Sequence, residues 1–335
     1  MSRIRSVKIS GFRRLVNLEL PLADHPLMVM IGANGVGKTS LLDAFSLLAA
    51  SADGKFNLFL NDLGGIVNLL THKKTDALIL SVDMDIPNYE PLKYFLSIIP
   101  KGQSYFINAE RLTQSRLSSG YPDPFLHIDS SNGDIRYYDV GKKQLTPPNW
   151  EYNFLETSLS QVPKMFKQPE DLRRMLCSST LYHFLNVGPR APIKLPQPMK
   201  PARLPGKNGE DIIPFLYNLR ETDPDRFETL EDTLRAAFPS FVRLNFPSVA
   251  AGMMTMTWKD EKYTDPFYMH QLSEGILRFL WLVSLLQSPE LSTVTMIDEP
   301  EVSLHPELLN LLSELMREAS QRTQLIVATH SDRLE

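Results

Sequence analysis

The sequence lacks several features that would assign it to a special class of protein. Its 335 residues include a single cysteine, Cys177, which excludes disulfides within the chain and is typical of a reducing compartment. The longest apolar run, residues 279–283, is far shorter than the ~20 residues that a transmembrane helix needs. Residues 1–8 have no apolar core of the kind found in secretory signals. These absences predict a soluble, cytoplasmic protein without a membrane segment.

The chain also lacks an excess of positive charge. Its 35 lysines and arginines and 39 aspartates and glutamates give a net charge of −4 and an isoelectric point of about 6.0. Any bound nucleic acid must therefore be held by a local basic patch. No heptad pattern is present, which argues against a long coiled coil, and no internal repeat is present. The composition, with 43% hydrophobic residues, is that of a globular chain long enough for two or more packed units.

A glycine-rich stretch at residues 32–39, GANGVGKT, is the most informative part of the chain. The apolar residues 26–31 before it predict a buried strand, and residues 40–49 after it have the apolar spacing of an amphipathic helix. The pattern G-x-x-x-x-G-K-[ST] therefore lies in the strand–loop–helix context of a phosphate-binding loop. The alternative is a glycine-rich turn that contains a lysine by chance, which the flanking strand and helix disfavour.

The residue types in this stretch match the needs of a bound nucleotide. Glycines let the backbone turn tightly, so that successive N–H groups point at phosphate oxygens, and the helix N-terminus adds partial positive charge. Lys38 would reach the β- and γ-phosphates, where it would also assist catalysis, and the hydroxyl of Thr39 would bind Mg²⁺. We therefore predict nucleotide contacts from Gly32, Asn34, Gly35, Gly37, Lys38, Thr39 and Ser40.

Two later apolar runs end in polar residues and predict the second half of the site. The strand expected before Asp298 and Glu299 would place Asp298 where Mg²⁺ is held beside a phosphate loop, and Glu299 could orient and deprotonate the attacking water. Residues 325–329 predict another strand, and His330 at its end can hydrogen-bond the γ-phosphate from the next strand over. The alternatives are helix-capping acids at an exposed strand end and a purely structural histidine.

A serine and a glycine precede the most apolar helix that the sequence predicts. Residues 271–275, QLSEG, lead into residues 276–286, which are apolar nearly all round and indicate a buried helix. Ser273 could simply cap this helix. It could equally form a second anion site, in which Ser273, Gly275 and the helix dipole face a phosphate.

The first 155 residues read as a mostly antiparallel sheet around the phosphate loop. Two strands joined at Gly11 begin the chain, and Asn132-Gly133 is a strong hairpin signal because both positions tolerate a positive φ angle. Arginines and lysines cluster at the first two strands. They either keep a sheet edge soluble or, through Arg13, approach the base or phosphates of the nucleotide.

The middle of the chain changes character. Residues 187–209 contain six prolines and five basic residues but no acidic residue. Such a segment is extended and packs poorly, so it is either a surface loop between subdomains or a basic contact surface for nucleic acid or an acidic partner. We expect three segments: residues 1–160 with the phosphate loop and antiparallel sheet, 161–270 with helices and the proline-rich region, and 271–335 with the second half of the site.

These segments together resemble ABC-type ATPases, in the branch of SMC, RecF and OLD-like proteins rather than transporters. The resemblance depends on the ordered set GANGVGKT, LSEG, TMIDEPEVSLHP and VATHS, which covers both ends of the chain. Residues 9–13 look like the opening strand turn of that branch, and residues 299–306 are similar to stand-alone ATPases found near bacterial phage-defence genes. The signature departs at Glu274, where SMC proteins have glycine.

The resemblance implies an α/β fold, namely an ABC-ATPase head of the P-loop NTPase class with a mixed sheet core, an antiparallel β lobe and an inserted helical subdomain. It also implies a mechanism in which two copies dock head to tail around two molecules of ATP with Mg²⁺. Each ATP would lie on Lys38 and Thr39 of one copy and be closed by Ser273 and Gly275 of the other. A glutamine that contacts Mg²⁺ is expected near the end of the first lobe, and Gln161 is at about that place, with Gln144 and Gln168 as competitors.

The function that this resemblance predicts is an Mg²⁺-dependent ATPase whose ATP-driven homodimerisation switches a partner or a DNA-bound state. Phage defence with a separately encoded, nuclease-like effector is the expected setting. A RecF-like DNA-repair ATPase that mainly binds DNA is the alternative, and a transporter subunit is disfavoured by the His-Pro run at residues 305–306. The resemblance also leads us to expect further strands or a helix after the strand that ends in His330.

Overall fold

A computed structural model describes residues 2–71, 75–116 and 123–334. The chain forms two compact units that are not contiguous in sequence. Unit 1 contains Met1–Pro26 and Ala33–Thr180, and unit 2 contains Leu27–Gly32 and Leu181–Glu335. The phosphate loop therefore begins in one unit and continues into the other. Of the helices in the described part of the chain, none combines the length and apolarity needed to cross a bilayer.

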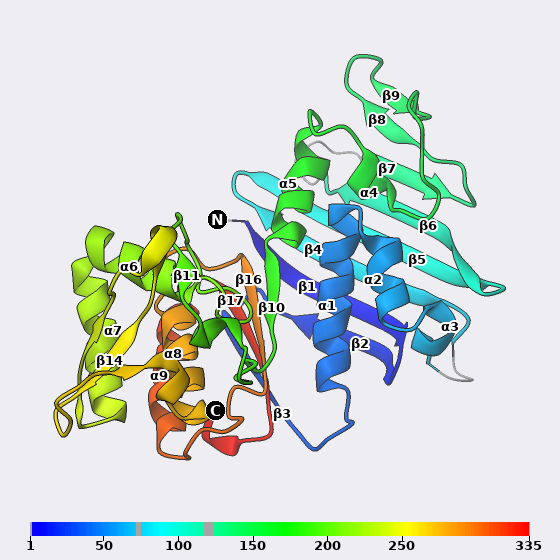
Figure 1. Cartoon of the computed structure of the whole chain (residues 1–335). Coiled ribbons are helices and arrows are strands. Elements are labelled where there is room, and N and C mark those ends of the chain that lie inside the picture. The colour runs from blue at the N-terminus through cyan, green and yellow to red at the C-terminus, as the bar shows by residue number, and fades with distance from the viewer. Residues whose placement is uncertain (1, 72–74, 117–122, 335) are drawn as a thin grey trace. The chain divides into compact units, whose positions relative to one another are not determined.

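Unit 1 is built on a single antiparallel sheet (Figure 1). Its eight strands lie in the order β2-β1-β4-β5-β6-β7-β8-β9, so most neighbours in space are also neighbours in the chain. The strands are β1 (Arg3–Phe12), β2 (Leu15–Pro21), β4 (Leu78–Ile86), β5 (Tyr89–Lys101), β6 (Ser104–Gln114), β7 (Phe125–Ser131), β8 (Tyr137–Asp139) and β9 (Gln144–Thr146).

Helices cover one face of this sheet because alternate strand residues are apolar. In β4, Leu78, Leu80, Val82 and Met84 are fully buried, the period of two expected of a strand with one face in a core. The longest helix, α1, lies along the sheet and contacts α5 (Figure 1). The helices of this unit are α1 (Lys38–Asp53), α2 (Phe56–Asp62), α3 (Ile66–Leu69), α4 (Ser158–Gln161) and α5 (Lys167–Cys177).

Two turns of this sheet test the sequence predictions. The predicted hairpin at Asn132-Gly133 is confirmed, because their φ angles are 50° and 83° and Asp134 bridges back to Ser131. The predicted turn at Gly11 is wrong, because β1 continues to Phe12 and the chain turns at Arg13 and Arg14. Gly11 is instead a tight approach within the strand, where an added Cβ would lie 2.2 Å from the carbonyl oxygen of Ala77.

The core of unit 2 is a four-stranded sheet in the order β10-β16-β17-β3. β17 pairs in parallel with both β16 and β3, and every residue of β16 and β17 is buried, as expected when both faces of a sheet are covered. The strands are β3 (Leu27–Ile31), β10 (Ser179–Tyr182), which crosses the unit boundary in the chain, β16 (Val294–Asp298) and β17 (Gln324–Thr329).

The remaining elements of unit 2 form its helical layer and small sheets. The helices are α6 (Ile212–Thr222), α7 (Pro224–Ala237), α8 (Glu274–Leu286) and α9 (Leu308–Ala319), with short 3₁₀ turns η1 (Pro192–Lys194), η2 (Ala250–Gly252), η3 (Met269–Gln271) and η4 (Asp332–Leu334). The small sheets pair β11 (Gln197–Pro198) with β13 (Met253–Met254), and β12 (Phe241–Asn245) with β14 (Thr257–Asp260) and β15 (Phe267–Tyr268).

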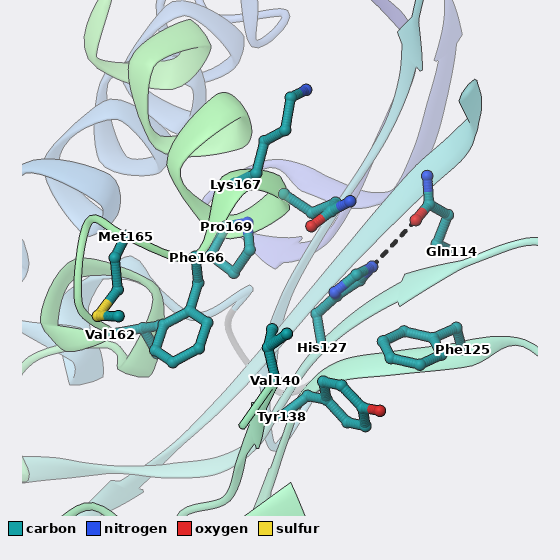
Figure 2. Close-up of a pocket in the computed structure, with 11 residues that line it drawn as sticks. Gln114, Phe125, His127, Tyr138, Val140, Val162, Met165, Phe166, Lys167 and Pro169 are labelled. Carbon is teal, nitrogen blue, oxygen red and sulfur yellow. Dashed lines mark hydrogen bonds between the residues drawn. The ribbon is translucent and has the colours of Figure 1, made fainter. Parts of the chain in front are cut away.

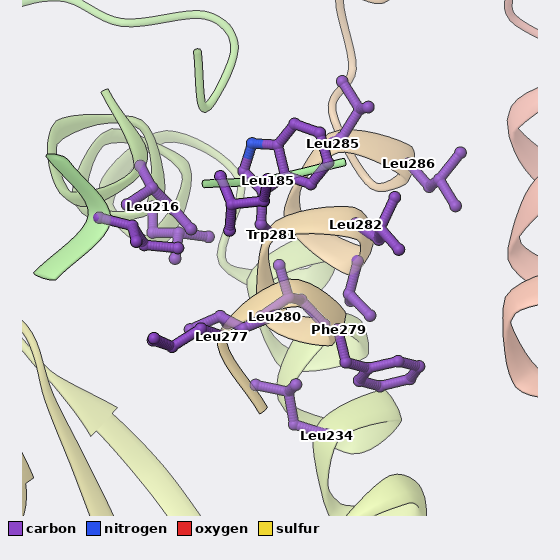
Figure 3. Packing of buried hydrophobic residues seen from close by; sticks show 14 of the residues in the cluster. Leu185, Leu216, Leu234, Leu277, Phe279, Leu280, Trp281, Leu282, Leu285 and Leu286 are labelled. Atoms are coloured by element: carbon purple, nitrogen blue, oxygen red, sulfur yellow. The ribbon is translucent and has the colours of Figure 1, made fainter. Parts of the chain in front are cut away.

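Helix α8 is the buried helix that its apolar sequence predicts. Figure 3 shows its side chains pointing into the core on several sides, toward Leu185, Leu216 and Leu234. The indole of Trp281 donates a hydrogen bond to the carbonyl oxygen of Gly206 over 2.8 Å, which satisfies its one polar group. The core of unit 2 is thus assembled around the helix that follows Ser273.

The proline-rich segment at residues 187–209 is a folded loop of unit 2. Its Gln197 is 3% exposed, donates to the carbonyl oxygens of Pro192 and Gly209, and accepts from the backbone N–H of Ile213 at the start of α6. Two of its basic side chains are paired, Lys200 with Asp211 and Arg203 with Glu290, each over 2.7 Å. The segment therefore has packing of its own, and these ion pairs reduce its basic character.

Candidate functional site

The phosphate loop in unit 1 ends at a helix N-terminus without a side-chain cap. Gly37 is the N-cap of α1, with a φ angle of 113°, and the first turn of α1 contains no acidic residue. The first backbone N–H groups of a helix have no partner within it, so an uncapped N-terminus is suited to hold an anion. Lys38, buried at this end, donates to the carbonyl oxygen of Ala33 over 3.3 Å, while Thr39 is exposed.

Two glycines of the loop are required by their surroundings. Gly35 and Gly37 have φ angles of 78° and 113°, which side chains of L-residues rarely adopt. An added Cβ would also be 3.3 Å from the guanidinium of Arg14 at Gly35 and 3.1 Å from Leu15 at Gly37. The other predicted contacts differ in exposure, since Asn34 is exposed and Ser40 is buried.

Arg13, the predicted nucleotide contact, lies at the turn between β1 and β2. Its guanidinium forms an ion pair with Asp43 of α1, and its own backbone has a φ angle of 50° at the turn after β1. Arg14 lies against Gly35, as the glycine geometry above requires. The contact of Arg13 with the nucleotide therefore stays a prediction, and Arg14 is a second arginine close to the loop.

Gln161, the predicted Mg²⁺ ligand, has its side chain bonded within its own loop. Its side-chain amide is bonded to the backbone of Asn153 in both directions and donates to the carbonyls of Glu156 and Thr157. Thr157 in turn donates to the carbonyl of Ser51, near the C-terminal end of α1. Ser51 follows Thr39 by 12 residues of α1, or ~18 Å of helix, so the loop of Gln161 is anchored near the opposite end of α1 from Thr39. Its competitors lie in β9 (Gln144) and α5 (Gln168).

In unit 2, Asp298 ends β16 with one carboxylate oxygen available. The residue is buried, and its Oδ1 has no hydrogen-bond partner among the described residues. Its Oδ2 lies 3.5 Å from Nδ1 of His183. An unsatisfied buried carboxylate oxygen is costly unless a cation or donor binds it. Oxygen is the ligand atom that Mg²⁺ prefers, so this arrangement fits the metal that the sequence predicts.

Glu299 and His330 are in contact at the ends of the neighbouring strands β16 and β17. The carboxylate Oε1 of Glu299 lies 3.2 Å from Nε2 of His330, and the backbone N–H of His330 donates to Glu301 over 2.6 Å. Glu299 has a φ angle of 51°, in the left-handed region that non-glycine residues seldom occupy. Its N–H bond of 2.8 Å to Ala328 on β17 helps to hold this backbone, and such strain is typical of functional positions.

His183 is a site residue that the motif search missed. It follows β10 directly, so it occupies the end of a third strand and contacts the oxygen of Asp298 described above. A small cavity of about 10 Å³ is lined by His183, Asp298, Glu299 and Arg278 of α8. Nε and Nη1 of Arg278 are buried and have no hydrogen-bond partner among the described residues. The signal for His183 was weak, because β10 contains a serine and a threonine and lacks the apolar run that precedes Asp298 and His330.

Ser273 and Gly275 lie at the start of α8. The hydroxyl of Ser273 accepts from the backbone N–H of Ile276 over 3.4 Å and so caps the helix. Gly275 is required here, because an added Cβ would lie 2.9 Å from the carbonyl oxygen of Ser303. Ser303 also donates to Glu274 over 3.5 Å. The start of α8 and the loop that contains the His-Pro run therefore pack together within unit 2.

Comparisons with known proteins show which families and folds the chain is similar to. Residues 3–195 match the family model described as "AAA ATPase domain", and residues 177–334 match "AAA domain, putative AbiEii toxin, Type IV TA system". The DNA replication and repair protein RecF of Acholeplasma laidlawii is 25% identical over 190 residues, which are 55% of this chain and 49% of RecF. The chain thus spans about half the length of this curated relative.

Solved structures of SMC heads share the fold. A head bound to the C-terminal winged-helix domain of ScpA has a TM-score of 0.60 at 13% identity and covers 99% of this chain and 91% of its own. A head with an extended coiled coil, bound to the C-terminal domain of ScpA and derived from Pyrococcus furiosus, has a TM-score of 0.54 at 12% identity, with 100% and 91% covered. These likenesses confirm the predicted ABC-ATPase head fold.

The model described as "AAA ATPase domain" covers more than half of the chain. The chain therefore belongs to the AAA ATPase domain family, and its resemblance to ABC-type ATPases of the SMC/RecF type is confirmed.

Proposed function

We propose that this ATPase is a switch in which Mg·ATP holds two copies head to tail, and that the assembled state controls an effector protein or a DNA-bound state. The observation that carries the proposal is the exposure of Ser273 and Glu274 at the N-terminus of α8. A helix N-terminus attracts phosphate, and the Ser273 hydroxyl can donate a hydrogen bond while it accepts one from Ile276. Ser273 and Gly275 thus suit a γ-phosphate held by the other copy.

We propose separate roles for the two sets of residues in each copy. Lys38, Thr39 and Arg14 hold the triphosphate, since they supply positive charge and a hydroxyl at the α1 N-terminus. Asp298 holds Mg²⁺ through the available oxygen, and the metal, when bound, neutralises charge on the β- and γ-phosphates. Glu299 takes the proton of the attacking water, and His330 orients the Glu299 carboxylate from β17.

The partner of the switch, in this proposal, is a separate effector protein. The solved SMC heads are bound to ScpA, so a protein partner on this fold is reasonable, and a separate nuclease-like effector in phage defence fits the similarity of residues 299–306 to ATPases near such genes. Pull-down from the native host with the Glu299→Gln protein and Mg·ATP would identify it. Recovery of the same proteins without ATP would contradict an ATP-controlled partner.

DNA binding in the manner of RecF is the second candidate, and the sequence similarity to RecF favours it. Several basic side chains that such binding would use are instead paired with acids, among them Lys8 with Glu19 and Arg203 with Glu290. Binding through phosphates should weaken steeply as salt rises. A titration of duplex DNA at 50 and 200 mM salt therefore tests this candidate, and absent or salt-independent binding would exclude it.

The decisive test of the switch is the mass in solution of the Glu299→Gln protein with and without Mg·ATP. We expect a monomer without nucleotide and a dimer with it, because slow hydrolysis keeps ATP bound. Adding Ser273→Arg to this variant should leave ATP binding intact and prevent the dimer. A mass that ATP does not change would contradict the switch. It would not contradict the ATPase activity, which is measured separately as ATP hydrolysis by the parent protein.

A further inference from the structure

A cavity of about 390 Å³ lies in unit 1, among residues that the ATPase chemistry does not use. This volume is within the range of small-molecule sites in proteins. Figure 2 shows Phe125, His127 and Tyr138, from β7 and β8, on one side of it, and Met165 and Phe166, from the segment between α4 and α5, on the other. The cavity therefore has two walls that come from distant parts of the chain.

The wall formed by β7 and β8 is aromatic. The ring centroids of Phe125 and Tyr138 are 4.5 Å apart in an edge-on arrangement, and those of Phe125 and His127 are 4.7 Å apart. The guanidinium of Arg116 lies 4.8 Å from the centre of the Phe125 ring. Packed rings of this kind are held in place by one another, and they offer planar surfaces to a planar ligand.

His127 presents a fixed hydrogen-bond acceptor to this cavity. Gln114 donates through Nε2 to the carbonyl of Glu90 over 2.9 Å, so its Oε1 is free to accept from Nε2 of His127 over 3.1 Å. Burial, assisted by the positive charge of Arg116, lowers the pKa of His127 to about 4. The imidazole is therefore neutral at pH 7 with its proton on Nε2, and Nδ1 can only accept. A ligand must bring an N–H or O–H donor to it.

The charges of the residues that line the cavity further limit the class of ligand. The described residues that line the cavity include Lys167 and no carboxylate. The ammonium of Lys167 is shared between Asp171, at 2.8 Å, and the ring of Tyr89. A cationic ligand would find no counter-ion here, so a neutral or anionic one is favoured.

Two large apolar side chains at the cavity are exposed to solvent. Met165 is 84% exposed and Val140 is 65% exposed. Covering them would release water from apolar surface, and methionine adapts readily to the face of a flat ring. The site thus combines the faces of aromatic rings, the flexible apolar side chain of Met165 and a hydrogen-bond acceptor, Nδ1 of His127.

We propose that this cavity binds a nucleobase, stacked against its aromatic wall and donating an N–H to Nδ1 of His127. The base can belong to a free nucleotide or to a single nucleic-acid strand, because both present the same planar ring with N–H groups at its edge. This inference goes beyond the ATP switch and does not depend on it, since the residues involved are separate from the phosphate loop and the acids of β16.

The test uses the Lys38→Ala protein, so that the phosphate loop does not compete, and probes that isolate the base. Adenosine and cytidine, which lack phosphates, are measured by saturation-transfer NMR, and a fluorescein-labelled 12-nucleotide single strand of mixed sequence by fluorescence anisotropy. Purine riboside, which lacks the amino group of adenosine, tests the donor to His127. We expect it to bind at least tenfold more weakly than adenosine if adenosine is the bound nucleoside.

Two substitutions and a matched control locate the binding. Met165→Glu and Tyr138→Ala should each weaken binding about tenfold or more, which is the size of one lost stacking contact. Leu58→Glu on α2, which is 60% exposed and distant from the cavity lining, should have no effect. ATP hydrolysis by Met165→Glu in the parent background should remain normal, which shows that the variant is folded.

The outcomes are distinguishable. Binding of a nucleoside that Met165→Glu abolishes supports the proposal with a free nucleotide as the source. Binding of the strand alone, with the same sensitivity, supports it with a nucleic acid as the source. Absence of binding by every probe, or binding that all three variants leave equal, would overturn it.

Discussion

The candidate site residues lie at the start of a helix in unit 1 and at the ends of strands in unit 2. In unit 1, α1 begins after Gly37 with an uncapped N-terminus and with Lys38 in its first turn. In unit 2, two neighbouring parallel strands end in Asp298, Glu299 and His330. The first arrangement concentrates positive potential and N–H donors, and the second concentrates carboxylates. In the function proposed above, phosphate binding and water activation belong to different units, so substitutions in each unit should affect different steps.

The largest effect should come from Glu299→Gln in unit 2. Removal of a general base slows chemistry by roughly 10²- to 10⁴-fold, while the amide keeps the size of the side chain. We expect ATP binding to remain close to that of the parent protein, measured by equilibrium titration beside phosphate-release kinetics. The control is Glu307→Gln, an exposed acid in the same unit, which should turn over normally. Normal turnover by Glu299→Gln would remove the residue from the base role.

Lys38→Ala in unit 1 should instead reduce binding. A lost charge-assisted hydrogen bond costs about 3 kcal/mol, which corresponds to roughly hundredfold weaker ATP binding. Titration of a fluorescent ATP analogue measures this, with Lys55→Ala, an exposed lysine at the other end of α1, as the matched control. Equal affinity of the parent and Lys38→Ala proteins would show that unit 1 does not supply the phosphate contacts.

The pH dependence of stability should distinguish the units in a different way. Burial lowers the pKa of His127 to about 4 from an ordinary value of 6.5, so the unfolded chain binds a proton that the folded chain excludes. The stabilisation is complete above pH 6.5 and is lost as the pH falls toward 4, which amounts to about 2 kcal/mol between pH 7 and pH 5. Denaturant unfolding at both values should show this loss in the parent and less of it in His127→Asn.

A substitution of the exposed His25, also in unit 1, serves as the control for this measurement. His25→Asn should keep the full pH dependence of the parent protein. An unchanged slope for His127→Asn would mean that His127 titrates alike in the folded and unfolded chain, contrary to its burial.

The smallest effect should be the loss of the cap on α8. Ser273→Ala removes the acceptor for the N–H of Ile276 and should lower the free energy of unfolding by about 1 kcal/mol, whereas Ser273→Gly should cost only a few tenths. Denaturant unfolding of the three proteins checks this. If both variants had the same free energy of unfolding as the parent protein, Ser273 would contribute nothing to the stability of the fold. Its position would then be explained by phosphate binding alone.

The sequence was most informative where one contiguous stretch determines the structure. The phosphate loop, the buried helix α8 and the strands that end in Asp298 and His330 are each local patterns of glycine, apolar spacing or a polar terminus. The ATPase that these patterns predict is confirmed by the family match. The fold class is confirmed by the likeness to solved SMC heads.

The parts that could not be predicted depend on contacts between distant residues. The side-chain amide of Gln161 is hydrogen-bonded within its own loop. That loop is anchored to α1 by the bond between Thr157 and Ser51, which are 106 positions apart in the chain. The contact of His183 with Asp298 requires the strand order β10-β16, which no local pattern encodes. The ion pair of Arg13 with Asp43 depends on a turn that falls two residues later than Gly11 suggested.

In the chain, β3 lies between the two segments that form unit 1, although it belongs to unit 2. This position affects how unit 2 can be produced as a fragment. A fragment of residues 181–335 would contain most of unit 2 but not β3, which forms the edge of its parallel sheet next to β17. β17 is buried along its whole length, so the fragment would present a bare apolar strand edge that pairs readily with other chains and aggregates. A soluble version of unit 2 needs residues 27–31 returned to it, as a grafted strand or an added peptide.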